Sequence, residues 1–252
     1  MWRAPAFALS LLASLNVLPQ AFMPCAPYGG DVAVKWFIEE ELRFPEEELQ
    51  QGVKGSSVLI FRVNANGDLV DLRIWRPLTP ACDAEALRIG KLVRWHPATV
   101  AGTPNDAEHY LEVPFDAKRY MKLRKERKCP SLSPEPIANE LTLYEPKQVT
   151  TPPTPDIPNG MKGLPTYINA HLRYPEVAYK RDLQGTVRME FVVERSGHVS
   201  NLRAIDALGG GCTEEALRQV REICWKPAEK DGKQVRCTQI VQIDFRLAPR
   251  DQ

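Results

Sequence analysis

One residue pattern occurs twice in this chain, and no other feature of the sequence constrains the fold as strongly. The matching positions all lie 130 residues apart and are mostly proline, glycine and aromatic residues: Pro45 and Pro175, Gly67 and Gly197, Trp95 and Trp225, and Phe115 and Phe245. The match runs without insertion or deletion, so both copies require the same backbone path. Because residues of these types set turns and fill cores, the repeat predicts two tandem copies of one small fold.

The repeat also divides the chain of 252 residues into domains. We expect a first domain at residues 30–116 and a second domain at residues 157–247. The segment between them, residues 117–156, starts with a basic run and continues into a stretch with eight prolines between residues 130 and 158. Proline-rich sequence cannot build a core and favours extended conformations. The sequence therefore predicts a basic and proline-rich linker.

The hydrophobic pattern predicts an α+β fold with an antiparallel sheet in each copy. In the second copy Val187, Met189 and Phe191 alternate with polar residues, which is typical of a strand that covers a core on one face. The expected elements are a short helix from Pro175, strands at 186–193 and 199–205, a helix from Thr213 that ends before Pro227, and a strand at 235–247. Thr213, and Asp83 in the first copy, are the expected helix N-caps.

Residues 1–23 predict export or attachment to a membrane. One basic residue, Arg3, precedes an apolar run from Ala4 to Leu18, as in a secretory signal peptide. The alternative is an uncleaved N-terminal anchor, because residues 4–23 reach the roughly 20 residues that a membrane span needs. A lipid anchor on Cys25 is a third alternative. We expect an exported protein and leave open whether it stays attached to the inner membrane.

The cysteines predict disulfide bonding in the second copy. Six cysteines are an even number in a chain expected to be exported. Cys82 and Cys212 occupy the same repeat position, which favours a structural role, whereas Cys224 and Cys237 occur only in the second copy. We expect a disulfide between those two, or between either of them and Cys212.

Charge and motif spacing argue against several functional classes. The net charge is +1 and the isoelectric point is about 7.6, which gives no reason to expect nucleic-acid binding. No histidine has a partner at metal-ligand or catalytic spacing, and we expect all four on the surface: His96, His109, His171 and His198. Gly209 to Gly211 lack the rest of a phosphate-binding loop. We therefore expect no enzyme activity, no metal, no cofactor and no small-molecule substrate.

Several motifs of the second copy resemble the C-terminal domain of TonB-type proteins. The motifs are Leu172-Arg173-Tyr174-Pro175-Glu176, Gly185-Thr186-Val187, Trp225-Lys226-Pro227-Ala228 and Ile243-Asp244-Phe245. The residues that mark the family in them are Tyr174, Pro175, Gly185, Trp225, Pro227 and Phe245. The first copy resembles the family more weakly, with Phe44 in place of the tyrosine. The chain is thus similar to two tandem TonB C-terminal domains, of which the second is the closer match.

The resemblance implies a periplasmic, non-enzymatic protein that binds a TonB box, which is a short extended segment of an outer-membrane transporter, or a segment of another envelope protein. It further implies that the segment is added as a strand to the last strand of the domain. The candidate contacts on that strand are Lys233, Gln234, Arg236, Thr238, Gln239 and Gln242. An exposed strand edge offers unpaired backbone groups, so the predicted strand is compatible with this role.

Two alternatives stay open. If residues 1–23 anchor the chain, the resemblance implies an energy transducer for TonB-dependent transport that couples to the inner-membrane proteins ExbB and ExbD. If the free strand edges pair with one another, the tandem is a structural or homodimerisation module.

Overall fold

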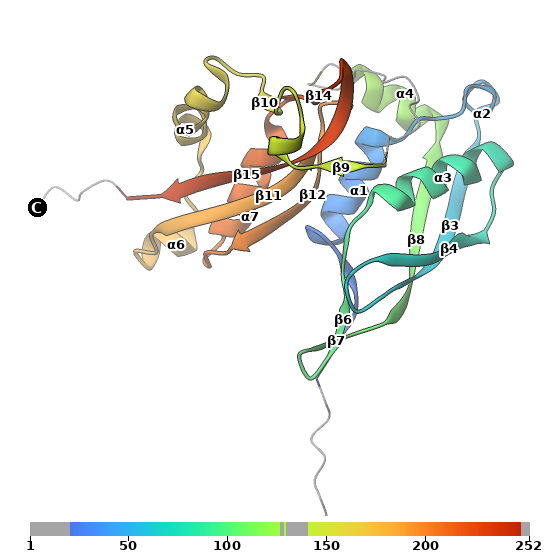
Figure 1. Ribbon diagram of the computed structural model, residues 1–252, viewed down its shortest axis with the longest axis horizontal. Coiled ribbons are helices and arrows are strands. Elements are labelled where there is room, and N and C mark those ends of the chain that lie inside the picture. Colours follow the sequence, from blue (N-terminus) through green and yellow to red (C-terminus); the bar gives the residue numbers. More distant parts are fainter. Residues whose placement is uncertain (1–20, 127–128, 130–140, 248–252) are drawn as a thin grey trace, which may run out of the picture.

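Both copies fold with the element order that the sequence predicts: a short helix, two strands, a helix and a last strand. The computed structural model describes residues 21–126, 129 and 141–247, and it shows each copy as an antiparallel sheet with helices packed on it (Figure 1). The α+β fold with two tandem domains is therefore confirmed.

The first domain is built on a three-stranded sheet with the strand order β4-β3-β8. Leu59 in the middle strand lies opposite Ile74 on one side and Leu111 on the other, in antiparallel register. The elements are β1 (Phe22–Met23), β2 (Ala26–Pro27), α1 (Gly30–Glu41), α2 (Glu46–Gln50), β3 (Lys54–Val63), β4 (Leu69–Arg76), α3 (Pro80–Leu92), β5 (Trp95–His96), β6 (Ala98–Val100), β7 (Thr103–Asn105), β8 (Ala107–Asp116) and α4 (Ala117–Glu126).

The second domain repeats this plan with a larger sheet, in which the strand order is β12-β11-β15-β14 and β9 also pairs with β15. The elements are β9 (Leu143–Tyr144), the 3-10 helix η1 (Pro146–Gln148), β10 (Thr154–Pro155), α5 (Gly160–His171), α6 (Glu176–Lys180), β11 (Gly185–Val193), β12 (Val199–Asp206), α7 (Cys212–Glu222), β13 (Trp225–Lys226), β14 (Ala228–Lys230) and β15 (Lys233–Phe245). The segment expected to link the domains thus contains α4, β9, η1 and β10.

The alternating apolar residues build the core of each domain. Val187, Met189 and Phe191 of β11 are fully buried, and Ala216 and Val220 of α7 pack in the same cluster. Burying side chains of this size contributes roughly 1.5 to 3 kcal/mol each. The period-two pattern of the strand and the apolar face of the helix therefore meet as the sequence predicts.

The two domains also pack against each other. Helix α1 of the first domain contacts β12 of the second, and the two elements are neighbours in Figure 1. Trp36 of α1 is partly buried and packs against both hydrophobic cores. Arg221 of α7 lies 5.6 Å from the centre of the Trp36 ring, which places a cation over its face. The tandem is therefore joined by side-chain contacts as well as by the chain.

The helix N-caps differ from the sequence prediction. Helix α3 begins at Pro80, and the side chain of Thr79 accepts a hydrogen bond from the Cys82 N–H (3.2 Å). The Asp83 carboxylate instead accepts from the backbone N–H of Leu78 (3.0 Å), and Thr213 makes the equivalent bond with the loop before α7. Both residues expected as N-caps therefore fix the loop before the helix. Their side-chain oxygens can accept from a loop N–H as well as from an N–H of the first helical turn.

The expected disulfide within the second copy is not formed. Cys224 is bonded to Cys129, with a Cα–Cα distance of 5.4 Å, and Cys212 and Cys237 are free and buried. Cys212 begins α7 and Cys224 lies just beyond its end at Glu222, and the helix is about 15 Å long at 1.5 Å per residue, which is too far for a disulfide. The bond instead ties the chain just beyond α4 to the end of α7.

The expected signal peptide or anchor lies almost wholly in residues 1–20, outside the described residues. In the described part of the chain, no helix has both the length and the apolar character that a membrane span requires.

Candidate functional site

The last strand of the second domain has one partly free edge. On one side β15 pairs with β11 without interruption, from Cys237 opposite Val193 to Phe245 opposite Gly185. At its beginning, residues 233–235 pair with β14, and residues 236–237 pair with β9. Among the described strands, none pairs with the side of residues 238–245 that faces away from β11. Figure 1 shows this part of β15 extending beyond β9 toward the C-terminus.

The six predicted contact residues divide along this edge. Lys233 and Gln234 pair with β14, and the Gln234 carbonyl also accepts a hydrogen bond from Arg195 (3.1 Å). The three that lie on the free stretch are Thr238, Gln239 and Gln242, of which Gln242 is exposed and the other two are half-buried. The backbone of this stretch can accept another strand, because its edge N–H and C=O groups have no partner among the described strands.

Arg236 is not an exposed edge contact. Its side chain is buried, and its guanidinium donates two hydrogen bonds to the Glu194 carboxylate (2.7 and 2.9 Å). The same group donates to the carbonyls of Leu92 (3.1 Å) and Leu141 (3.3 Å). A guanidinium buried with a carboxylate and two carbonyls is satisfied inside the molecule, so it is unavailable to a ligand.

The partners of Arg236 belong to a polar contact between the domains. Glu41 at the end of α1 accepts hydrogen bonds from Ser196 (2.7 Å) and Arg88 (3.4 Å), which lie in different domains. Burial, and then the nearby Glu194 carboxylate, raises the pKa of Glu41 above its ordinary value, and Arg88 opposes this effect. The hairpin that joins β11 to β12 is therefore held by charged groups of the first domain.

His198 belongs to the same contact and corrects the expectation that all histidines lie on the surface. Only 5% of its surface is exposed, and its Nε2 atom is 3.3 Å from the Glu40 carboxylate of α1. Nearby, the Asn201 side chain accepts a hydrogen bond from the Arg94 N–H (2.6 Å) and donates one to the Leu92 carbonyl (3.0 Å). These bonds fix the hairpin against the end of α3.

The six family-marker residues are structural. The Tyr174 ring meets Phe245 edge-on at 5.8 Å and its hydroxyl donates to the Leu183 carbonyl, while Trp225 meets Phe191 at 5.1 Å. The remaining three stand at element boundaries: Pro175 before α6, Gly185 at the start of β11, and Pro227 between β13 and β14. The three aromatic residues therefore pack in the core under the sheet that carries β15, and the other three lie where its elements begin or end.

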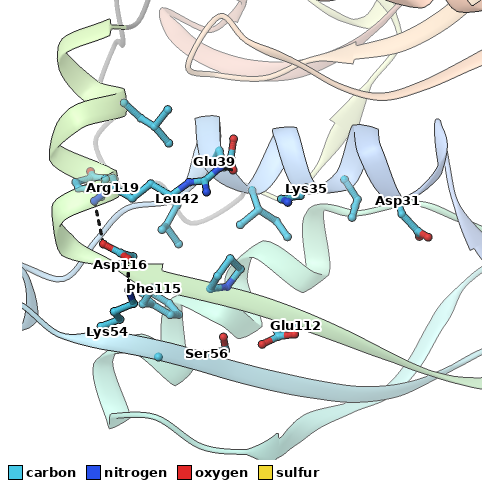
Figure 2. Close-up of a pocket in the computed structure, with 16 residues that line it drawn as sticks. Asp31, Lys35, Glu39, Leu42, Lys54, Ser56, Glu112, Phe115, Asp116 and Arg119 are labelled. Atoms are coloured by element: carbon cyan, nitrogen blue, oxygen red, sulfur yellow. Dashed lines mark hydrogen bonds and ion pairs between the residues drawn. The ribbon is translucent and has the colours of Figure 1, made fainter.

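A groove of about 640 Å³ lies in the first domain, between α1, β8 and α4 (Figure 2). Its apolar lining consists of Val34, Ile38, Leu42, Pro114, Phe115, Tyr120 and Leu123. At the rim Lys54 pairs with Asp116 (3.2 Å) and Arg119 pairs with Glu39. The Arg119 N–H and then Lys54 lower the pKa of the Asp116 carboxyl. Because these rim charges compensate one another, the groove favours apolar groups.

Sequence reasoning missed the contact between the domains. Glu194 and Arg236 stand where the first copy has Asn64 and Asp106, so one position is neutral in the first copy and the other has the opposite charge. When the charge at one position differs between two otherwise matching copies, the side chains at that position are expected to have different surroundings in the two domains. The difference does not identify the partner, since Arg236 and its first-domain partner Leu92 are far apart in the sequence.

Comparison with known proteins gives one family. The family model of the Gram-negative bacterial TonB protein C-terminal matches residues 40–117 and 170–247, and no curated protein matches the chain. Among solved structures, the chain is similar to the Helicobacter pylori TonB C-terminal domain, with 16% identity and a TM-score of 0.26, covering 34% of this chain and 78% of that one. It is also similar to the Pseudomonas aeruginosa domain, with 20% identity and a TM-score of 0.25, covering 31% and 81%.

Proposed function

This chain belongs to the family of Gram-negative bacterial TonB C-terminal domains, and we propose that its second domain binds an extended segment of an outer-membrane transporter, or of another envelope protein, by strand addition to β15. Domains of this family are periplasmic and bind such partners. The observation that carries the proposal is the free edge of residues 238–245, which is supported from the other side by the full length of β11.

The chemistry of this edge suits reversible binding. A segment along residues 238–245 gains four or five backbone hydrogen bonds, which contribute roughly 2 to 7 kcal/mol at about 0.5 to 1.5 kcal/mol each before ordering costs. Gln239, Gln242 and Ile240, whose side chain is 47% exposed, lie on this stretch, whereas the Thr238 hydroxyl donates to the Tyr144 carbonyl (3.4 Å). The backbone therefore supplies affinity, and these side chains contribute specificity.

A titration with modified peptides tests strand addition directly. Successive N–H groups of a strand point to opposite sides, so N-methylation of alternate residues of a ligand removes the donors on one side only. We expect one alternate set of methyl groups on a synthetic TonB-box peptide to abolish binding to the full chain, and the other set to leave it nearly unchanged.

The readout is the backbone amide spectrum of β15. Resonance changes confined to residues 238–245 and their β11 partners support the proposal, and a scrambled peptide serves as the control. Equal tolerance of both methylation patterns, or changes on other elements alone, contradicts it.

A homodimer is the second candidate, because the first domain also ends in a strand with a free side. Strand β8 pairs with β3 along residues 107–116, and no other described strand pairs with it. Two such edges in one chain can join two molecules. Light scattering of the peptide-free protein at increasing concentration distinguishes the candidates, since a dimer whose edges are occupied loses mass when the peptide binds.

A further inference from the structure

The beginning of the β15 edge is already occupied by the chain itself. Strand β9 runs parallel to β15, with Leu143 opposite Arg236 and Tyr144 opposite Cys237. Because Cys237 also pairs with Val193 of β11, β9 must lie on the opposite side of β15 from β11. That is the side on which residues 238–245 are free. The native structure therefore already contains one extended segment paired with this edge, immediately before the free stretch.

Side-chain contacts hold β9 in place. The Arg236 guanidinium donates a hydrogen bond to the Leu141 carbonyl (3.3 Å), and the Thr238 hydroxyl donates to the Tyr144 carbonyl (3.4 Å). The Tyr144 ring packs against a small apolar cluster that includes Cys237, and the Lys230 ammonium lies 4.3 Å from the ring centre. Strand β9 is thus fixed at both of its ends and through its aromatic side chain.

The chain leaves the edge abruptly after Tyr144. Pro146 begins η1 with its backbone dihedral angle φ restricted, and Glu145 and Gln148 form a reciprocal capping box. The Glu145 N–H donates to the Gln148 side chain (2.7 Å), and the Gln148 N–H donates to the Glu145 carbonyl (2.9 Å). A locked turn at this position prevents β9 from continuing along β15, so the free stretch begins at Thr238.

We propose that β9 acts as an internal stop that fixes the position of an added segment on β15. The added segment pairs with residues 238–245 and ends next to Tyr144. It cannot extend further, because the edge of β15 at Arg236 and Cys237 is already paired with β9. This inference rests on the proposed function and specifies which length of segment the site accepts. Eight residues of β15, about 26 Å at roughly 3.3 Å per residue, are available.

Arg236 connects this stop to the first domain. The guanidinium that holds the Leu141 carbonyl also holds Glu194 and the Leu92 carbonyl at the end of α3. The orientation of that group, and with it the anchor of β9, therefore depends on the first domain being in place. Arg236 is a positioning residue for the site rather than a contact with the ligand.

A footprinting experiment on the intact protein tests the stop. The probes are synthetic TonB-box peptides with eight and with ten ordered residues, followed by the backbone amide spectrum. In the unmodified protein we expect resonance changes over residues 238–245, unchanged amides at Leu143, Tyr144, Arg236 and Cys237, and affinities for the two peptides within about twofold of each other.

Removal of β9 is the matching perturbation. Because successive residues turn their N–H groups to opposite sides, the double substitution Leu143→Pro/Tyr144→Pro removes the donor of β9 on whichever side it lies. We expect the footprint to extend to Arg236 and Cys237. The longer peptide then binds about fivefold more tightly, which corresponds to two further hydrogen bonds of about 0.5 kcal/mol each. Lys162→Ala, on the exposed face of α5, is the control that leaves the footprint unchanged.

The outcomes separate the two proposals. If the peptide displaces β9 in the unmodified protein, so that the amide resonances of Leu143 and Tyr144 move together with those of Arg236 and Cys237, the stop is refuted and strand addition stands. If no peptide changes any amide of β15, the proposed function fails and the stop fails with it. The first measurement needs no variant, so it remains decisive even if the proline variant does not fold.

Discussion

The hairpin between the first two sheet strands has opposite surroundings in the two domains. In the second domain every residue from 194 to 202 is buried, whereas none of the equivalent residues 64–72 of the first domain is. The backbone is nevertheless the same, since Asn201 and its counterpart Asp71 both have positive φ angles, of 51° and 56°. The two hairpins therefore differ in what covers them rather than in how they fold.

The side chains follow this difference. Asn201 binds the backbone of the first domain at Arg94 and Leu92, while Asp71 pairs with Arg62 on the surface at 3.1 Å. Shared positions such as the two tryptophans keep the same core role in both copies. The comparison shows that the hairpin and the last strand of the second domain are held by hydrogen bonds to the first domain.

The largest expected difference between the copies is at Arg236 and its counterpart Asp106. We expect Arg236→Ala to lower the free energy of unfolding by about 3 to 5 kcal/mol, because it leaves the Glu194 carboxylate buried without its cation. Asp106→Ala changes it by about 0.5 kcal/mol or less, since that side chain is half exposed. Urea unfolding of both variants measures the difference. If Arg236→Ala lowers the free energy of unfolding as little as Asp106→Ala does, the contact between the domains adds no stability.

The disulfide gives the next largest effect. The bond between Cys129 and Cys224 closes a long loop, with a sequence separation of 95 residues. We expect Cys129→Ser/Cys224→Ser to cost about 2 to 5 kcal/mol, which reduction of the unmodified protein should reproduce. The control is the double variant Cys82→Ala/Cys212→Ala, which removes two buried thiols that form no disulfide, so that its disulfide stays intact and reduction should still lower its stability. A Cys129→Ser/Cys224→Ser variant that retains the full stability of the oxidised protein contradicts this expectation.

The smallest expected effect is the pH dependence of the domain contact. Because burial and Glu194 raise the pKa of Glu41, this group stabilises the fold fully below the unfolded pKa near 4.5, and its contribution is lost as the pH rises through the folded pKa. A tenfold difference in proton affinity between the folded and unfolded states corresponds to about 1.4 kcal/mol of stability. We expect Glu41→Gln to flatten the stability profile above pH 4.5, and exposed Glu47→Gln to leave it unchanged. If the stability of both variants changes with pH in the same way, Glu41 is not the source of the pH dependence.

Much of the fold could be predicted because its signals are local or repeated. The alternation of Val187, Met189 and Phe191 gave a strand, and Pro227 marked the end of a helix, without knowledge of any partner. The prediction for Cys224 was wrong because a disulfide depends on the distance between two distant segments. The expected exposure of His198 and Arg236 was wrong for the same reason, since a neighbouring domain covers both.

The sequence by itself determined that one small α+β fold occurs twice and that its last strand is long enough to serve as an edge. Periodicity and turn residues carry this information, because they act within a few positions of the chain. Only the tertiary structure decided which part of that edge is free. Strand β9 pairs with β15 across about ninety residues of sequence, and α1 covers a hairpin about 155 positions away. Contacts over such separations depend on how the whole chain packs, which no local pattern specifies.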